Sequence, residues 1–249
     1  MAGRSSKTEA VVLRSIRLGE ADRVLHLYTL ERGRVGAVAK GVRKTRSRFG
    51  ARLEPLSHVE LVLYRGSGEL ETVTGVQLLR AHHAVRADYD RLSVGLIGAE
   101  AMLRLFSEQE ANERAFRALT RFLDLLDDSV HRPGRPALDP LGLSFQLKLL
   151  WLSGYLPHLT SCAECGADGV PLVGYSPRAG GAVCGGCAAR AEALVLSADG
   201  ISGIEALLAK PLADAAALSL SERSRRDALR VVTASYEYHG GFRLRTLSA

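Results

Sequence analysis

The sequence predicts an α+β fold, in which a small five-stranded β-barrel is followed by an α-helical domain with a four-cysteine, zinc-finger-like insertion. Three observations support this fold class. The first eighty residues contain five short β-type segments, the residues after 85 follow a helical period, and all four cysteines lie in one short segment. We expect domains at 1–80 and 81–249, with the metal module at about 160–190.

The predicted strands are short and rich in β-branched residues, and glycine or acidic residues mark most of the joints between them. They cover residues 8–18, 22–31, 33–41, 57–65 and 69–78. Gly33 and the pair Gly66 and Gly68 predict hairpin turns. Five strands in this length favour a closed barrel of the OB or SH3 type over half of a sandwich.

Apolar residues recur at helical spacing in the second part of the chain. One expected stripe contains Leu92, Leu96, Ala99, Leu103 and Phe106, and a second contains Phe116, Leu119, Leu123 and Leu126. The segment at roughly 139–156 is apolar nearly all round, which predicts a helix at the centre of the helical domain. Ser197 or Asp199 is expected to cap a helix that ends near Leu208. Residues 221–239 predict a last helix with basic residues on one side.

The cysteines form two CxxC pairs, Cys162 with Cys165 and Cys184 with Cys187, and eighteen residues lie between the pairs. This spacing is typical of a zinc site in which four thiolates surround one tetrahedral ion. We therefore expect one structural Zn²⁺ per chain, with a hairpin between the pairs. Iron uses the same four ligands, so the spacing alone leaves iron as an alternative to zinc. A reducing cytoplasm disfavours two disulfides. His158 is a further candidate ligand, although an ordinary loop role is the simpler expectation.

The basic excess of the chain is confined to its first third. Residues 1–80 carry 15 Lys/Arg and 8 Asp/Glu, whereas the remaining residues carry 18 and 19. Within 40–52 no acid interrupts the basic residues Lys40, Arg43, Lys44, Arg46, Arg48 and Arg52. This stretch predicts a loop that grips the phosphates of nucleic acid, with a solvated loop as the alternative. Phe49 either stacks on a base or packs the end of the barrel.

Other patterns narrow the class of protein. The sequence contains no GxxxxGK[ST], no GxGxxG after a strand and no HExxH, so nothing in it supports catalysis, and we expect a non-enzyme. No apolar run is long enough for a membrane span, and MAGRSSKTEA lacks the apolar stretch of a secretory signal, so we expect a cytoplasmic protein. The neighbours His82 and His83 should point apart on an extended segment. Asp127 and Asp128 are expected to be solvated at a helix end.

The motifs of the first domain resemble those of the bacterial RecO family of recombination mediators. The resemblance rests on GEADR at 19–23, TLERG at 29–33, AKGVR at 39–43, SRF at 47–49 and LEP at 53–55. It continues through the helical part, the four-cysteine module and YHGGFRLRTL near the end of the chain. It therefore covers nearly the whole sequence.

This resemblance implies an OB-fold followed by a helical domain with a zinc-finger-like insertion. It implies binding to single- and double-stranded DNA at the nucleoid and annealing of complementary strands without ATP. It also implies partnership with RecR and with single-stranded-DNA-binding protein, so that RecA is loaded onto coated DNA. For the acidic tail of the single-strand-binding protein we expect the last helix to supply Arg223, Arg225, Arg226 and Arg230. Two alternatives stay open: a zinc-ribbon protein–protein adaptor with incidental nucleic-acid contact, and a nuclease with an unrecognised site.

Overall fold

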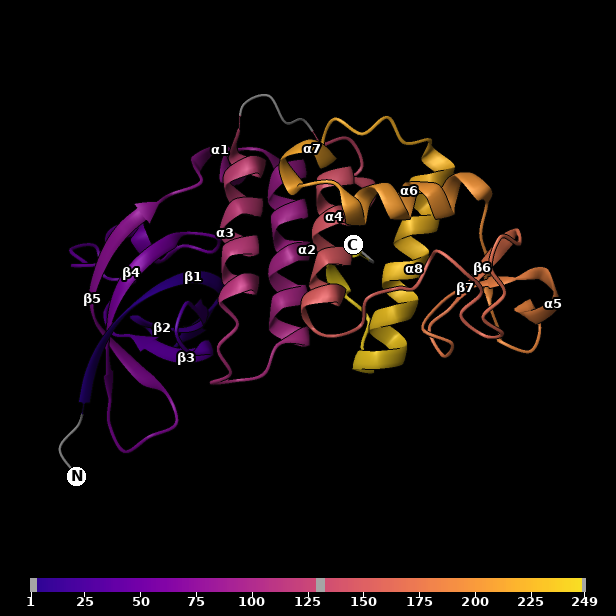
Figure 1. The fold of residues 1–249 in the computed structure, drawn as a ribbon. Helices are drawn as coiled ribbons and strands as arrows, with labels where there is room; N and C mark the ends of the chain where they lie inside the picture. The colour runs from indigo at the N-terminus through magenta and orange to yellow at the C-terminus, as the bar shows by residue number, and fades with distance from the viewer. Residues whose placement is uncertain (1–3, 129–132, 248–249) are drawn as a thin grey trace. The chain divides into compact units, whose positions relative to one another are not determined.

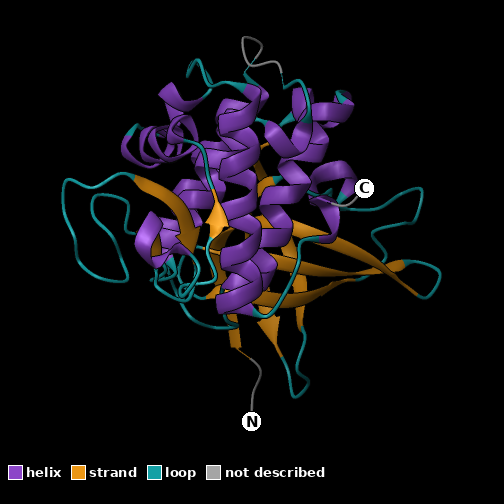
Figure 2. Ribbon diagram, turned by 90° about the vertical axis from the view of Figure 1, so that its right-hand side faces the viewer, coloured by secondary structure: helices purple, strands orange, loops and turns teal. Residues whose placement is uncertain are grey.

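The structure, a computed structural model, describes residues 4–128 and 133–247 and divides into two compact units (Figure 1). Unit 1 comprises Met1–Asp128 and unit 2 comprises Ser129–Ala249. The expected boundary near residue 80 marks the change from strands to helices, whereas the first compact unit extends beyond it. Figure 2 shows the same chain by element type, with strands in orange and helices in purple.

Unit 1 begins with a closed five-stranded barrel, which confirms the predicted OB-type fold. The strands are β1 (Arg4–Leu18), β2 (Asp22–Thr29), β3 (Gly33–Ala39), β4 (His58–Arg65) and β5 (Glu71–Arg80). Their order around the barrel is β1-β2-β3-β5-β4, and β1 pairs with both β2 and β4. A register shift between Val12 and Arg14 allows this long strand to serve both neighbours, because a bulge bends a strand and increases its twist.

The barrel interior is filled by apolar side chains from alternate strand positions, as the period of two requires. Buried members include Leu25, Leu27, Val59, Leu61 and Leu63. After β3 the chain forms a turn-rich loop and a short 3₁₀ helix, η1 (Gly50–Leu53), before it enters β4. Phe49 and Leu53 from this connection also belong to the barrel core.

The barrel closes through a short parallel seam between β3 and β5. Only two residue pairs, Ala37 with Glu71 and Val38 with Thr72, make up this seam, while the antiparallel neighbours have longer registers. Arg32 stabilises the region because its guanidinium donates to both carboxylate oxygens of Glu71, at 2.7 and 3.0 Å.

Three helices complete unit 1: α1 (His83–Ala87), α2 (Tyr89–Leu105) and α3 (Glu113–Asp127). The side chain of Asp88 caps α2 by accepting from Arg91 N, and that of Asn112 caps α3 by accepting from Ala115 N. The stripe predicted for α3 is confirmed, since its four apolar members are all buried.

The stripe predicted for α2 is only partly right. Ala99 and Phe106 are buried, but the other three members are only partly covered, and Val94, Ile97 and Met102 are more deeply buried. Small residues explain the difference: a Cβ on Gly95 would lie 2.7 Å from Leu56, so glycine lets the helix approach the chain there. A pattern built on large apolar residues misses such a face.

The loop between α2 and α3 is fixed to the β2–β3 turn. The Arg34 guanidinium donates to the carbonyls of Leu103 (2.6 Å) and Phe106 (3.0 Å). Gly33 occupies the predicted turn with φ of +63°, and a Cβ there would lie 2.0 Å from the carbonyl oxygen of Glu110. These contacts make the helices part of the same compact unit as the barrel.

Unit 2 is helical around α4 (Pro140–Leu152), whose residues are buried on nearly every side, as expected for the central helix. Outside the four-cysteine module, its other described helices are η2 (Pro136–Leu138), α6 (Ala198–Ala209), α7 (Leu212–Ala215), α8 (Glu222–Gly240) and η3 (Arg245–Leu247). Ser197 is the cap of α6, and Ser221 caps α8 by accepting from Ser224 N. Among residues 4–128 and 133–247, no helix combines the length and apolar character needed to cross a membrane.

The four-cysteine module of unit 2 is built on a small sheet with the order β7-β6-β8. Its elements are β6 (Leu172–Ser176), β7 (Gly181–Cys184), the one-turn helix α5 (Gly185–Ala188) and β8 (Leu194–Val195). The antiparallel β6–β7 pair is the hairpin predicted between the cysteine pairs. Tyr175 in β6 and Ser235 in α8 share a 2.8 Å hydrogen bond between their hydroxyls, which joins the module to the helices of unit 2.

Candidate metal centre and nucleic-acid interface

The four cysteine sulfurs converge on one point. The Sγ atoms of Cys162, Cys165, Cys184 and Cys187 all lie within 4.8 Å of one another, and those of Cys165 and Cys184 are 4.0 Å apart. A tetrahedral zinc ion with Zn–S distances of about 2.3 Å holds its sulfurs about 3.8 Å apart. The donor set therefore fits one metal ion with a complete shell of four thiolates, which leaves no position for a substrate.

Backbone geometry shapes the first cysteine pair for this role. Gly166, at φ of +75°, donates its N–H to Cys162 O at 2.8 Å and so closes a tight turn. The N–H of Cys184 donates to the Sγ of Cys162 at 3.4 Å. This amide, with further backbone N–H groups of the turn, lowers the pKa of the Cys162 thiol to about 6, which favours the thiolate that a metal needs.

An arginine that the sequence analysis did not single out lies against the cluster. Arg190 Nε donates to Glu164 Oε1 at 3.1 Å, and its Nη2 lies 3.5 Å from the Sγ of Cys187. Glu164 stands between the two cysteines of the first pair, so the ion pair joins the two halves of the site. His158 stays outside the cluster and contacts Ser161 Oγ at 2.7 Å.

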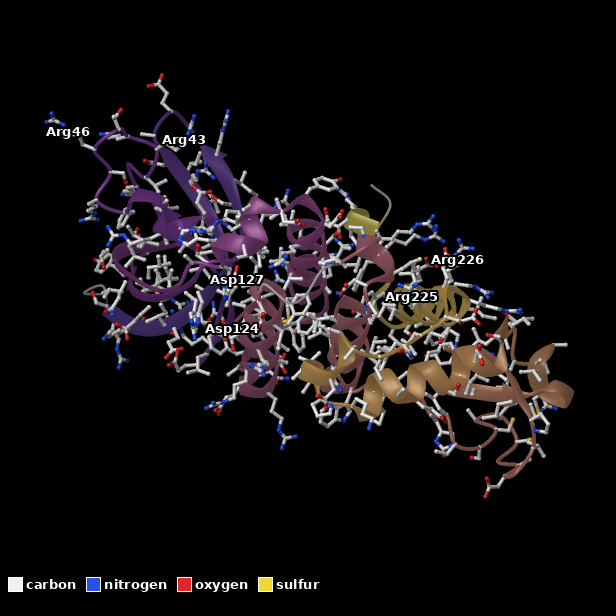
Figure 3. All side chains as sticks on the ribbon, turned by 90° about the horizontal axis from the view of Figure 1, so that it is seen from above. Arg43, Arg46, Asp124, Asp127, Arg225 and Arg226 are labelled. Atoms are coloured by element: carbon white, nitrogen blue, oxygen red, sulfur yellow. The ribbon has the colours of Figure 1, made fainter. Side chains whose placement is uncertain are left out.

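The predicted basic loop lies on the surface of unit 1, between β3 and η1. Lys40, Arg43, Lys44, Arg46 and Arg48 are all exposed. Within the described residues, the side chains of Lys40, Lys44 and Arg46 have no hydrogen-bond or ion-pair partner. In Figure 3 the guanidinium of Arg46 lies at the outer edge of the barrel and points away from it.

The first half of the loop is held against the β1–β2 turn. Arg43 donates its backbone N–H to Ala21 O at 2.9 Å, and its guanidinium donates to the carbonyl of Glu20 at 2.9 Å. Gly41 N donates to Asp22 Oδ1 at 2.7 Å. The loop therefore has a defined position on the barrel rather than being a free connection.

Arg52 and Phe49 serve the structure of the loop itself. Arg52 donates from Nε to Phe49 O at 2.8 Å and from Nη1 to Val76 O at 3.2 Å, and it also donates to the carbonyl of Arg48. Its guanidinium is thus largely used on backbone carbonyls. Phe49 is only 1% exposed and lies in the barrel core, which favours packing of the barrel end over base stacking.

Two family models together match nearly the whole chain. Residues 1–82 match the model described as Recombination protein O N terminal, and residues 86–248 match Recombination protein O C terminal. The chain belongs to the RecO family.

Relatives named DNA repair protein RecO agree with this assignment. The Rubrobacter xylanophilus protein is 42% identical over 234 residues, covering 92% of this chain and 90% of the relative. The Anaeromyxobacter dehalogenans protein is 36% identical over 242 residues, covering 96% and 93%. The Thermobifida fusca protein is 42% identical over 183 residues, covering 73% and 72%. These RecO relatives place the chain in a family of DNA repair proteins.

The four arginines expected to bind a RecO partner all lie on α8, but they differ in availability. Arg226 pairs with Glu222 at 2.7 Å, and Arg230 donates to Val195 O at 2.7 Å and approaches Asp227 at 3.3 Å. Arg225 is half-buried, and its Nε has no partner within the described residues. Arg223 is exposed. Figure 3 shows Arg225 and Arg226 on this helix.

Proposed function

We propose that the chain is a recombination mediator in DNA repair that binds single- and double-stranded DNA at the nucleoid and anneals complementary strands without ATP. The observation that carries this proposal is the basic loop, which is fixed to the barrel and keeps five exposed cations. Membership of the RecO family supports it. In this role the protein is a binding and assembly factor, not an enzyme.

The mechanism that we propose is electrostatic. Two complementary strands repel each other because both are polyanions, and cations on the loop neutralise phosphates and raise the local concentration of the strands. Phe49 is buried, so the loop itself offers no aromatic ring on which a base could stack. Bases of a strand held by its phosphates stay free to pair, which suits annealing and gives little sequence preference.

The proposal predicts how strongly the DNA-binding constant should depend on salt concentration. If Lys40, Arg43, Lys44, Arg46 and Arg48 each contact one phosphate of a single strand, log K falls against log salt with a slope of about −3.5. Arg52 is left out of this count because it is half-buried and donates from Nε, Nη1 and Nη2 to backbone carbonyls, whereas Arg43 is exposed and uses only Nη1 in this way.

The test compares two triple variants of equal charge change. R43Q/K44Q/R46Q removes two arginines and one lysine from the loop, and K7Q/R114Q/R121Q removes the same types from exposed positions elsewhere in unit 1. We expect the loop variant to bind a labelled oligonucleotide more weakly and with a flatter salt slope, and to lose annealing, while the control keeps both.

Each alternative gives a different outcome in this test. Equal losses in both variants would mean that net charge rather than the loop carries binding. DNA binding without faster annealing would favour the zinc-ribbon adaptor. Cleavage of labelled DNA after addition of Mg²⁺ would reveal a nuclease.

We further propose that RecR and single-stranded-DNA-binding protein are partners in loading RecA. For the acidic tail of the single-strand-binding protein, support comes from the arginine face of α8. The charges of Arg226 and Arg230 are partly offset by Glu222 and Asp227, so Arg223 should contribute most. Anisotropy of a labelled acidic tail peptide should therefore show a larger loss for R223Q than for R226Q, and equal binding by both variants and the wild type would refute this surface.

We propose that the metal is structural Zn²⁺, one ion per chain. The four-thiolate donor set and the absence of an open ligand position support this choice. When bound, the ion holds the two cysteine pairs together and supplies no reactive site. Elemental analysis should give one zinc per chain, and iron, with the visible absorption of an iron–thiolate centre, would replace the assignment.

A further inference from the structure

Two arginines face each other across the β1–β2 pair. Arg17 and Arg23 are Cα partners in this antiparallel register. Directly opposite residues project from the same face with Cβ atoms about 5 Å apart, and like charges in this arrangement destabilise the sheet. The Arg17–Arg23 pair therefore does not help to hold β1 and β2 together.

No acidic group compensates the pair within the described residues. Arg23 is half-buried and donates from Nη1 to the hydroxyl of Ser15 at 3.0 Å, while Arg17 is exposed and its side chain makes no polar contact. The nearest acids in sequence are Glu20 in the β1–β2 turn and Asp22 at the start of β2. Asp22 accepts from Gly41 N, and Glu20 is exposed and forms no ion pair.

The pair lies at the end of the barrel where the basic loop starts. Arg23 is also the Cα partner of Ala39, the last residue of β3, and Lys40 follows directly. The β1–β2 turn is itself bonded to the loop through Arg43. The two arginines are therefore next to the loop in space, although they precede it by many residues in the sequence.

We propose that Arg17 and Arg23 form a phosphate-binding site that continues the nucleic-acid path from the basic loop onto the β1–β2 hairpin. The proposal rests on the function proposed above and adds two residues from a different element. Each guanidinium offers a planar pair of donors to phosphate oxygens, and Ser15 holds that of Arg23 in position. An anion between the two cations also relieves their repulsion.

This arrangement predicts opposite effects on stability and on binding. Removing one arginine relieves the repulsion in the free protein and at the same time removes a phosphate contact. A residue with a purely structural role would instead lose stability on substitution. The two measurements together therefore distinguish a binding role from a structural one.

The experiment uses the full chain, a fluorescein-labelled oligothymidylate and the variant R17Q. R14Q is the matched control, because Arg14 is exposed on the same strand but pairs with His26 on the opposite face. We expect R17Q to weaken binding about 3- to 10-fold and to flatten the salt slope by about 0.7, the change for one single-strand phosphate contact. Its melting temperature without DNA should equal or exceed that of the wild type, and R14Q should bind as the wild type does.

The outcomes separate this inference from the proposed function. If the wild type does not bind the oligonucleotide, the proposed function fails. If the wild type binds and R17Q binds equally well, only the Arg17–Arg23 site is refuted. A lower melting temperature together with weaker binding would show a structural role and also overturn it.

Discussion

The Nε2 of His82 lies 3.2 Å from Oδ1 of Asp124, and this contact joins the end of the barrel to α3. On the other side of the ring, Nδ1 lies 2.7 Å from the carbonyl oxygen of Leu56. His82 is buried and adopts a left-handed backbone with φ of +47°, just before α1 begins at His83. The expected extended segment is therefore wrong, because a helix starts immediately after the barrel.

His82→Asn should destabilise unit 1 by about 2 kcal/mol, because it leaves the carbonyl of Leu56 and the carboxylate of Asp124 without the ring. Asparagine tolerates the left-handed backbone, so the change isolates the ring contacts. Urea unfolding followed by circular dichroism measures the loss. His83→Asn is the control, since His83 is exposed, and an equal effect in both variants would contradict the assigned role of His82.

Unit 1 should become less stable as the pH falls from about 7 toward 5. Burial lowers the pKa of His58 below its usual value of about 6.5, even though Glu9 Oε2 lies 3.1 Å from its Nε2. The unfolded chain then binds a proton that the folded chain does not, so stability is present above about pH 6.5 and is lost below it. The pKa of His26 is lowered too, by burial and by Arg14 and Arg34, and acts in the same direction.

The pH effect is measured as the urea midpoint across this range. His58→Gln should flatten the curve below about pH 6.5, because it removes one of the two described rings of unit 1 whose pKa is lowered. A variant with the same pH profile as the wild type would exclude His58 as a contributor.

Phe49→Ala should destabilise the barrel by about 3 to 5 kcal/mol, because it leaves a cavity beside Leu53 in the core. Phe49→Leu should cost less than about 1.5 kcal/mol and should keep DNA affinity. The two variants are compared by thermal unfolding and by oligonucleotide anisotropy. If Phe49→Leu is stable but binds DNA weakly, the result would instead favour a role for Phe49 in stacking on a base.

Arg190→Gln should weaken metal retention about 10-fold, as the loss of a group that supports metal ligands commonly does. Arg190 lies beside the sulfur of Cys187 and pairs with Glu164, so it offsets thiolate charge and joins the cysteine pairs. Zinc competition with a chromophoric chelator gives the affinity. Arg178→Gln is the control for the sulfur contact, because Arg178 also lies 3.9 Å from Glu164 and reaches the carbonyl of Arg190 but contacts no sulfur. Equal losses in both variants would mean that the contact with the Cys187 sulfur does not matter.

The strands and the cysteine cluster could be predicted because their signals are local. Alternation and turn residues placed all five strands, and two CxxC pairs brought four sulfurs together whatever the exact path between them. The roles of Phe49 and Arg52 depend on how the loop returns to the barrel, which no local pattern contains. Asp127 was expected to be solvated, but its Oδ1 accepts from Val85 N at 3.0 Å, a contact between segments far apart in sequence. The Arg17–Arg23 pairing could not be predicted, because the register between β1 and β2 depends on the exact length of the turn that joins them.

The short parallel seam between β3 and β5 has a consequence for the order of folding. The pairs β1–β2, β2–β3 and β4–β5 each join neighbours along the chain, whereas β1–β4 and β3–β5 both join distant segments. Of these two distant pairings, β1–β4 has a long register, while β3–β5 has only Ala37 with Glu71 and Val38 with Thr72. Closing the loop between β3 and β5 costs conformational entropy, confines the loop cations, which repel one another, and is offset by only two residue pairs, so the seam should form last. Counterions or a bound polyanion would screen this repulsion and speed the final closure of the barrel.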